Sequence, residues 1–115
     1  NNSEIPAGAN GLVVEELVNF AQTTCHGAES LRDAGYTVTH GATILFYGNP
    51  EAIGNLKDHG MEEIYLFTLP DVLAVAEKHQ THPANVIADY RVFLKDPLGW
   101  QADRGLTPVE RGGTL

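Results

Sequence analysis

The apolar residues of this chain gather in short runs, which polar and glycine-containing stretches separate. Three of these runs have the length of buried strands: residues 12–14, the later part of residues 36–46, and residues 64–67. A continuous apolar run of this length is typical of a parallel sheet, because such strands are buried on both faces. The pattern therefore predicts three strands.

Helices are predicted between these strands. Residues 24–34 place small side chains on one face and stop at Gly35, a residue type that readily ends a helix. Asn49 followed by Pro50 predicts the start of a second helix, which Gly60 ends. Asparagine caps free N–H groups at a helix start, and proline fits the first helical position.

Two further helices are predicted in the last third of the chain. Thr68 and Asp71 have the spacing of a capping box, in which each side chain bonds to the backbone N–H of the other residue. Residues 83–94 carry an apolar stripe at helical spacing, and Pro97 is expected to close this last helix. The stripe consists of Val86, Ile87, Tyr90, Phe93 and Leu94.

Strands that alternate with helices of this length indicate right-handed parallel crossovers. We therefore expect an α/β fold of three layers, in which a short parallel sheet is flanked by helices. Doubly wound domains usually have five or six strands, so three strands indicate part of a larger unit. The chain of 115 residues has the size of one domain, which we place at residues 11–106. Residues 1–10 and 107–115 are expected to be a flexible entry and tail.

The amino-acid composition disfavours several classes of function. Fifteen acidic against seven basic residues give a formal charge of −8, which disfavours binding to nucleic acid or to an anionic membrane surface. No apolar run approaches the roughly 18 residues of a membrane span. One cysteine cannot form an internal disulfide, and residues 1–10 lack the apolar run of a secretory signal, so a cytoplasmic protein is expected.

A candidate site follows the first predicted strand. Glu15 and Glu16 come directly after it, and a polar loop through Thr24 leads into the next helix. Open parallel sheets bind ligands at this position. Carboxylates can accept hydrogen bonds from sugar hydroxyls, while N–H groups at a helix start can hold a phosphate. A sugar phosphate is therefore a candidate ligand, although spacing alone favours two solvated acids and an ordinary threonine cap.

Other reactive residue types indicate structure rather than a second site. Cys25 and His26 are neighbours on a helix and point about 100° apart, so they cannot act together as nucleophile and base. His79 and His82 have no second pair with ligand spacing, so a metal site is not expected.

Two further patterns have a structural explanation. Glycines within residues 41–54 lack the spacing of a dinucleotide-binding loop. Tyr90, Phe93 and Trp100 are expected to lie in the core or on a dimer surface, rather than to stack on bases.

Residues 12–17 (LVVEEL), followed by Thr23, resemble the phosphoribosyl diphosphate (PRPP) motif of type I phosphoribosyltransferases. The chain downstream of this motif is similar to the orotate phosphoribosyltransferase branch of that family. The similar segments are residues 28–35 (AESLRDAG), 56–60 (LKDHG), 65–73 (YLFTLPDVL) and 93–100 (FLKDPLGW). The resemblance covers roughly residues 5–106 and corresponds to the C-terminal half of such an enzyme.

The resemblance implies a set of roles for the loop. Glu15 and Glu16 stand where the family binds the ribose hydroxyls of PRPP, and Mg²⁺ is expected to accompany PRPP. The phosphate-binding positions are Asn19, Phe20, Ala21, Gln22, Thr23 and Thr24. The reaction of the branch joins orotate and PRPP to give orotidine 5'-monophosphate and pyrophosphate, in pyrimidine nucleotide biosynthesis.

The chain also departs from the family pattern. Phe20 is a bulky ring where a tight anion-binding turn is expected, and neither Ala21 nor Gln22 is the glycine that such a turn favours. Residues 46–48 (FYG) stand where many orotate enzymes carry an Asp-Arg pair.

Family members are nearly twice this length, and the catalytic loops belong to the half that is not matched. We therefore assign no catalytic residue and expect the short chain alone to be inactive. The alternative is a non-catalytic module of this fold that acts as a homodimer or with a partner chain.

Overall fold

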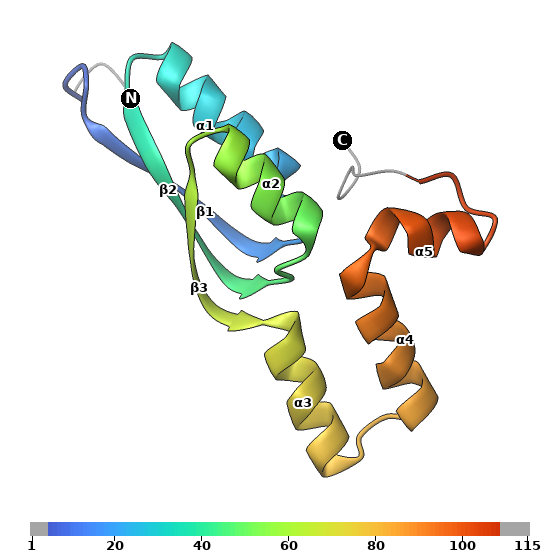
Figure 1. Cartoon of the computed structure of the whole chain (residues 1–115). Helices are drawn as coiled ribbons and strands as arrows, with labels where there is room; N and C mark the ends of the chain where they lie inside the picture. The colour runs from blue at the N-terminus through green and yellow to red at the C-terminus, as the bar shows by residue number, and fades with distance from the viewer. Residues whose placement is uncertain (1–4, 109–115) are drawn as a thin grey trace.

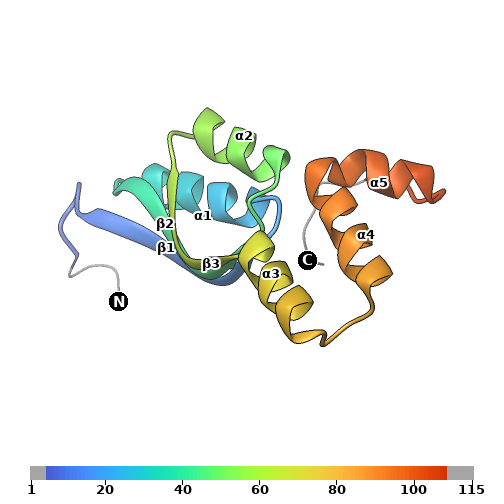
Figure 2. The ribbon, with the colours of Figure 1, turned by 60° about the horizontal axis from the view of Figure 1, so that its bottom comes forward.

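A three-stranded parallel sheet forms the centre of the computed structural model, which describes residues 5–108 (Figure 1). The strands are β1 (Asn10–Val18), β2 (Thr37–Phe46) and β3 (Glu62–Thr68), and they lie side by side in chain order. The first two helices, α1 (Gln22–Asp33) and α2 (Pro50–Asp58), connect the strands and lie on the same face of the sheet (Figure 2). The expected α/β class with a short parallel sheet is confirmed.

Three more helices follow the last strand: α3 (Leu69–His79), α4 (Ala84–Lys95) and α5 (Pro97–Asp103). The capping box of α3 is confirmed, since Thr68 Oγ1 accepts a hydrogen bond from Asp71 N and Asp71 Oδ2 accepts one from Thr68 N. Hydrogen bonding to the carboxylate by the Thr68 backbone N–H, and secondly by the Thr68 side chain, lowers the pKa of the Asp71 carboxyl, because it favours the charged form.

Two of the differences from the sequence-based bounds exceed two residues. The first strand does not stop at Val14 but continues to Val18, because its pairing with β2 extends as far as Val18 opposite Phe46. The sequence predicts that the helix closed by Pro97 is the last one of the chain. This prediction is wrong, because a further helix begins at Pro97. Asp96 accepts a hydrogen bond from Gly99 N at 3.0 Å and caps a new helix, in which Pro97 takes the first position.

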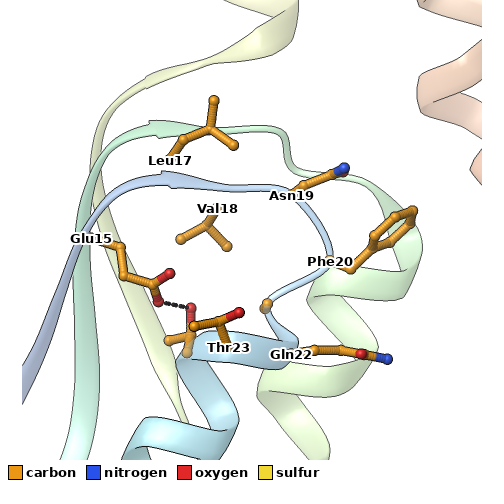
Figure 3. A pocket seen from close by; sticks show the side chains of 9 residues that line it. Glu15, Leu17, Val18, Asn19, Phe20, Gln22 and Thr23 are labelled. Atoms are coloured by element: carbon orange, nitrogen blue, oxygen red, sulfur yellow. Dashed lines mark hydrogen bonds between the residues drawn. The ribbon is translucent and has the colours of Figure 1, made fainter. Parts of the chain in front are cut away.

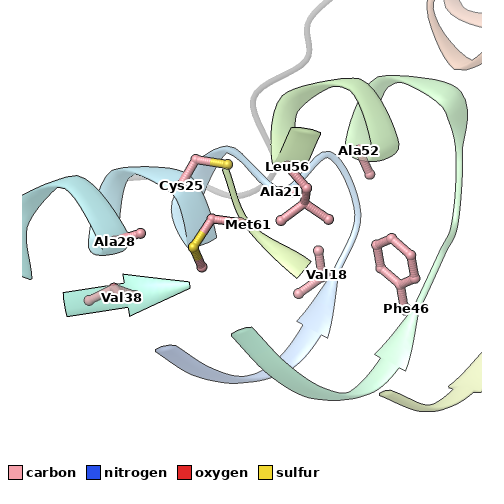
Figure 4. Packing of buried hydrophobic residues seen from close by; sticks show 9 residues of the cluster. All are labelled: Val18, Ala21, Cys25, Ala28, Val38, Phe46, Ala52, Leu56 and Met61. Atoms are coloured by element: carbon pink, nitrogen blue, oxygen red, sulfur yellow. The ribbon is translucent and has the colours of Figure 1, made fainter. Parts of the chain in front are cut away.

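The main core lies between the sheet and the layer of α1 and α2 (Figure 4). Small residues on α1 let this helix approach the sheet, and Ala28 is fully buried there. Cys25 is also part of the core: burial raises its pKa to about 11, and its thiol donates to the carbonyl of Asn55. The cluster consists of Val18, Ala21, Cys25, Ala28, Val38, Phe46, Ala52, Leu56 and Met61.

A second, smaller core joins α3 and α4 to the sheet unit. Leu69 and Leu73 of α3 and Ile87 of α4 are buried together, and Tyr47, which follows β2, packs against them. Leu94 of the predicted apolar stripe also packs here, whereas Tyr90 of that stripe is half exposed.

The sheet face opposite α1 and α2 is open (Figure 2). Val14 and Leu66 have exposed fractions of 71% and 70%, and Leu12, Ile44 and Ile64 are also half exposed. The described residues thus form two of the expected three layers, the sheet and the layer of α1 and α2. The radius of gyration of 16.6 Å also exceeds the roughly 13 Å of a compact domain of this length.

Candidate functional site

The turn from β1 into α1 surrounds a pocket of about 280 Å³ at the carboxyl end of β1 (Figure 3). All six residues that the sequence places in the phosphate loop line this pocket. Its lining consists of Glu15, Leu17, Val18, Asn19, Phe20, Ala21, Gln22, Thr23 and Thr24. The local sequence thus brings the expected residues together, except for Glu16.

Glu15 and Glu16 lie within β1 rather than in the loop that follows it, so their side chains point to opposite faces of the sheet. Glu15 is half-buried on the helix side, where its carboxylate accepts a hydrogen bond from Thr24 Oγ1 at 2.5 Å. Glu16 is exposed and lines a hollow on the open face together with Val14 and Ile44. The structure therefore brings only the first acid to the pocket.

The loop makes its turn without glycine. Ala21 adopts φ 65° and ψ 14°, a left-handed conformation that is uncommon for a residue with a Cβ atom. The Phe20 side chain is buried, and Figure 3 shows its ring on the side of the loop away from Glu15. The ring therefore does not fill the space between Glu15 and the start of α1.

Two asparagines of the α2 segment hold the loop in place. The Nδ2 group of the fully buried Asn49 donates to the carbonyl of Asn19 at 2.9 Å, and Asn55 Nδ2 donates to the carbonyl of Phe20 at 2.9 Å. In a trans peptide the N–H points opposite to the carbonyl. The N–H groups of Phe20 and Ala21 therefore point away from α2.

The start of α1 has no side-chain cap and no acid in its first turn, whereas α2, α3 and α5 are capped by side chains. The N–H groups of Thr23 and Thr24 meet no capping side chain, and they and the positive dipole end of α1 suit an anion. The hydroxyl of Thr24 is bound to Glu15, but Thr23 is exposed at the pocket. The expected threonine cap is absent from this helix, because the N-cap residue is Ala21.

Sequence reasoning missed Glu63, which lies on β3 opposite Gly41 of β2. Both of its carboxyl oxygens are buried and have no hydrogen-bond partner among the described residues. Burial, and secondly the nearby Glu15 carboxylate, raise the pKa of Glu63 to about 7. A Cβ atom at Gly41 would come within 2.4 Å of Glu63 Oε1, so the glycine leaves room for this carboxyl.

Within residues 5–108, no cluster of three or more His, Cys, Asp or Glu side chains has the geometry to hold a metal ion. The helices of this range are also all too short or too polar to cross a membrane.

No protein-family model matches the chain. Curated relatives include the orotate phosphoribosyltransferase of Jannaschia sp., 38% identical over 104 residues, which are 90% of this chain and 46% of the relative. The orotate phosphoribosyltransferase of Sinorhizobium fredii is 33% identical over 102 residues, which are 88% of this chain and 44% of the relative. The chain thus spans about half the length of the curated relatives it matches.

Two solved structures share the fold. The Leishmania donovani UMP synthase structure matches with a TM-score of 0.68 at 24% identity, over 79% of this chain and 20% of that chain. The orotate phosphoribosyltransferase structure from Aeropyrum pernix matches with a TM-score of 0.55 at 24% identity, over 66% of this chain and 43% of that chain.

The sheet, the connecting helices and the loop after β1 place the chain in the phosphoribosyltransferase fold class. Within that class the chain is similar, over nearly its whole described length, to about half of the curated orotate phosphoribosyltransferases. The family resemblance seen in the sequence is confirmed.

We expect Asn49→Ala to lower the free energy of unfolding by about 2–4 kcal/mol, since it removes a helix cap and leaves buried polar groups unpaired. Asn49→Ser keeps an oxygen that can cap α2 but not the bond to Asn19, and should recover about half of the loss. Urea unfolding of the three proteins measures both effects. Equal stability of Asn49→Ala and the unchanged chain would show that the loop does not depend on this residue.

Glu63 should make the protein less stable as the pH rises from about 4.5 to about 7. The folded state, in which its pKa is about 7, retains a proton that the unfolded chain, with an ordinary pKa of 4.5, has lost. Glu63→Gln should remove this decrease and unfold at higher temperature than the unchanged chain above pH 7. The exposed Glu16→Gln on β1 is the control, since it removes a carboxylate that lies in solvent, and melting curves from pH 4 to 8 compare the three proteins. The same pH dependence in Glu63→Gln would show that other groups cause it.

Proposed function

We propose that the chain binds the ribose 5-phosphate part of PRPP, or of a nucleotide, in the pocket between Glu15 and Thr24. The uncapped start of α1 carries this proposal, because its N–H groups and dipole suit a phosphate. The Thr23 hydroxyl lines the same pocket and adds a donor. Glu15 lines the pocket as well, and in this proposal its carboxylate accepts hydrogen bonds from ribose hydroxyls.

The affinity should be low. The helix dipole contributes about 0.3–1 kcal/mol to anion binding, and charge-assisted hydrogen bonds add to it. The Glu15 carboxylate and the overall charge of −8 oppose a free anion. Ribose hydroxyls can donate hydrogen bonds to the Glu15 carboxylate and so offset its repulsion of the phosphate. Ribose 5-phosphate should therefore bind better than inorganic phosphate.

We further propose that these residues are the phosphate-side half of an orotate phosphoribosyltransferase-like unit. Formation of orotidine 5'-monophosphate from orotate and PRPP requires stabilisation of the leaving pyrophosphate and orientation of the two substrates. No lysine, arginine or histidine lines the pocket within the described part of the chain. The 115-residue chain alone should therefore show no turnover.

Mg²⁺ that arrives with PRPP would find few ligands here. Glu15 is bonded to Thr24, and Glu16 lies on the opposite face of the sheet. The two carboxylates therefore do not converge, and Mg²⁺ would rely mainly on the oxygens of the diphosphate, with Glu15 as the available protein carboxylate.

Titration of the amide NMR signals with ribose 5-phosphate and with inorganic phosphate tests the site. We expect millimolar binding of ribose 5-phosphate, weakened several-fold by Glu15→Gln, because a neutral amide accepts hydroxyl hydrogen bonds less strongly. Inorganic phosphate should bind no worse to this variant than to the unchanged chain. Glu16→Gln is the matched control and should bind both ligands as before. If neither ligand shifts the signals of residues 19–24, or if Glu16→Gln is the weaker variant, the site is not the one proposed.

A second proposal, a module that associates with a copy of itself, is supported by the open sheet face. A contiguous exposed apolar surface of this kind is typical of a binding interface. Two such faces can pack at the spacing of about 10 Å found between stacked sheets. The charge of −8 on each copy opposes association, so the apolar contact must outweigh it.

Light scattering at micromolar concentration should therefore show a dimer or larger species. Leu66→Lys places a charge on the open face and should shift the chain toward monomer. Val92→Lys is the control, since Val92 is similarly apolar and exposed but lies on α4. A stable monomer in the unchanged chain, or equal dissociation by both variants, would contradict self-association through this face.

A further inference from the structure

A second carboxyl lies behind the Glu15 pocket. Glu63 of β3 and Thr24 of α1 both lie against Gly41 of β2: a Cβ atom at Gly41 would clash with Glu63 Oε1 and would lie 3.1 Å from Thr24 Cγ2. The Thr24 hydroxyl in turn donates a hydrogen bond to the Glu15 carboxylate, which lines the pocket. Glu15 and Glu63 thus lie next to the two ends of the Thr24 side chain, the hydroxyl and the methyl group.

The two carboxyls have different surroundings. Glu15 accepts a hydrogen bond and lines the pocket, whereas both carboxyl oxygens of Glu63 are buried without a hydrogen-bond partner among the described residues. A charged carboxylate in such a place loses its hydration and gains no bond in return, so the group retains its proton instead. The pKa of about 7, which burial and secondly the Glu15 charge raise, agrees with this arrangement.

The cations of the two covering helices do not neutralise Glu63. Arg32 of α1 donates from Nε and Nη2 to the carbonyl of Val38, at 3.2 and 2.7 Å. Lys57 of α2 lines the hollow beside β3 together with Glu63, but it does not bond to the buried carboxyl oxygens. Glu63 therefore has no cation to hold it in the charged form.

The remaining ionisable groups on the facing side of α1 are acidic or neutral. Glu29 pairs with His59 of the α2 segment at 3.1 Å. The Cys25 thiol is neutral near pH 7, because burial, and secondly the Glu29 charge, raise its pKa to about 11. The charge that acts on Glu63 is therefore that of Glu15.

A phosphate in the Glu15 pocket would add negative charge on this side of the sheet. Its repulsion by an ionised Glu63 would oppose binding, whereas a protonated Glu63 carries no charge to repel it. A ligand that binds better to the protonated form also strengthens the binding of the proton, since the coupling is reciprocal. Occupation of the pocket and protonation of Glu63 should therefore favour each other.

We propose that Glu63 sets the affinity of the Glu15 pocket through its proton: ribose 5-phosphate binds while Glu63 is neutral, and the pocket loses affinity when Glu63 ionises. Glu63 does not line the pocket, so it acts through the charge that it places behind Glu15 and Thr24. The effect on the ligand rests on the proposed function, because it requires a phosphate in the pocket. The coupling between the two carboxyls does not.

The coupling can be measured without ligand. The carboxyl carbon signal of Glu63 in NMR spectra, identified by its loss in Glu63→Gln, should titrate with a midpoint at a pH of about 7. Glu15→Gln removes the neighbouring charge and should lower this midpoint by at least about half a pH unit. Glu16→Gln is the matched control, because it removes the adjacent charge of β1 from the opposite face of the sheet and should leave the midpoint unchanged.

The effect on the ligand can be measured between pH 7 and pH 9, where its phosphate, with a second pKa of about 6, stays ionised. The affinity of the unchanged chain for ribose 5-phosphate should fall at least about two-fold, because Glu63 is half protonated at the start of this range and ionised at its end. Glu63→Gln remains neutral, so its affinity should be the same at both pH values and higher than that of the unchanged chain at pH 9. Preserved amide dispersion shows that the variant is folded.

A Glu63 midpoint near its ordinary value of 4.5, or one that Glu15→Gln leaves unchanged, would overturn the inference. An equal loss of affinity in the unchanged chain and in Glu63→Gln would also overturn it, although the proposed function would then stand. If ribose 5-phosphate does not bind at either pH, the proposed function and the ligand effect are rejected together. A midpoint of about 7 that Glu15→Gln lowers would still support the coupling of the two carboxyls.

Discussion

The hydrogen bonds of Asn49 are the interaction on which the arrangement of the phosphate loop depends. This fully buried side chain caps α2 through its Oδ1, which accepts from Ala52 N at 2.8 Å. Its Nδ2 donates to both the carbonyl and the side-chain oxygen of Asn19. Asn19 lines the phosphate pocket, so one residue sets the position of the loop relative to α2. A buried amide with unmatched groups is costly, and this requirement makes the loop geometry specific.

Local chemistry explains why much of the fold could be predicted. Asn49, Thr68 and the glycines after α1 and α2 mark helix ends through interactions within a few residues, and such signals are readable in the sequence. The extension of β1 was not readable, because two adjacent acids are typical of a loop. They are tolerated in a strand because Glu15 bonds to Thr24 and Glu16 stays in water.

The features of the site that could not be predicted from the sequence depend on contacts between segments that are far apart along the chain. Glu63 becomes buried only because the β2–β3 register places it opposite Gly41, and this register cannot be deduced from either strand alone. Ala21 is not a residue type that predicts a left-handed turn, so the loop geometry depends on bonds from Asn49 and Asn55.

The open sheet face and the phosphate pocket make different demands on whatever covers the sheet. The phosphate pocket is lined by Glu15 and by the turn into α1, on the helix side of the sheet, so a layer on the opposite face need not obstruct it. Glu16 limits how complete that layer can be, since it is exposed beside Val14 and Ile44. A carboxylate buried without a partner costs several kcal/mol, which exceeds the gain of about 1.5–3 kcal/mol from burying one large apolar side chain. Any partner that covers the whole face must therefore bring a cation or N–H donors to Glu16, and a purely apolar partner must stop short of it.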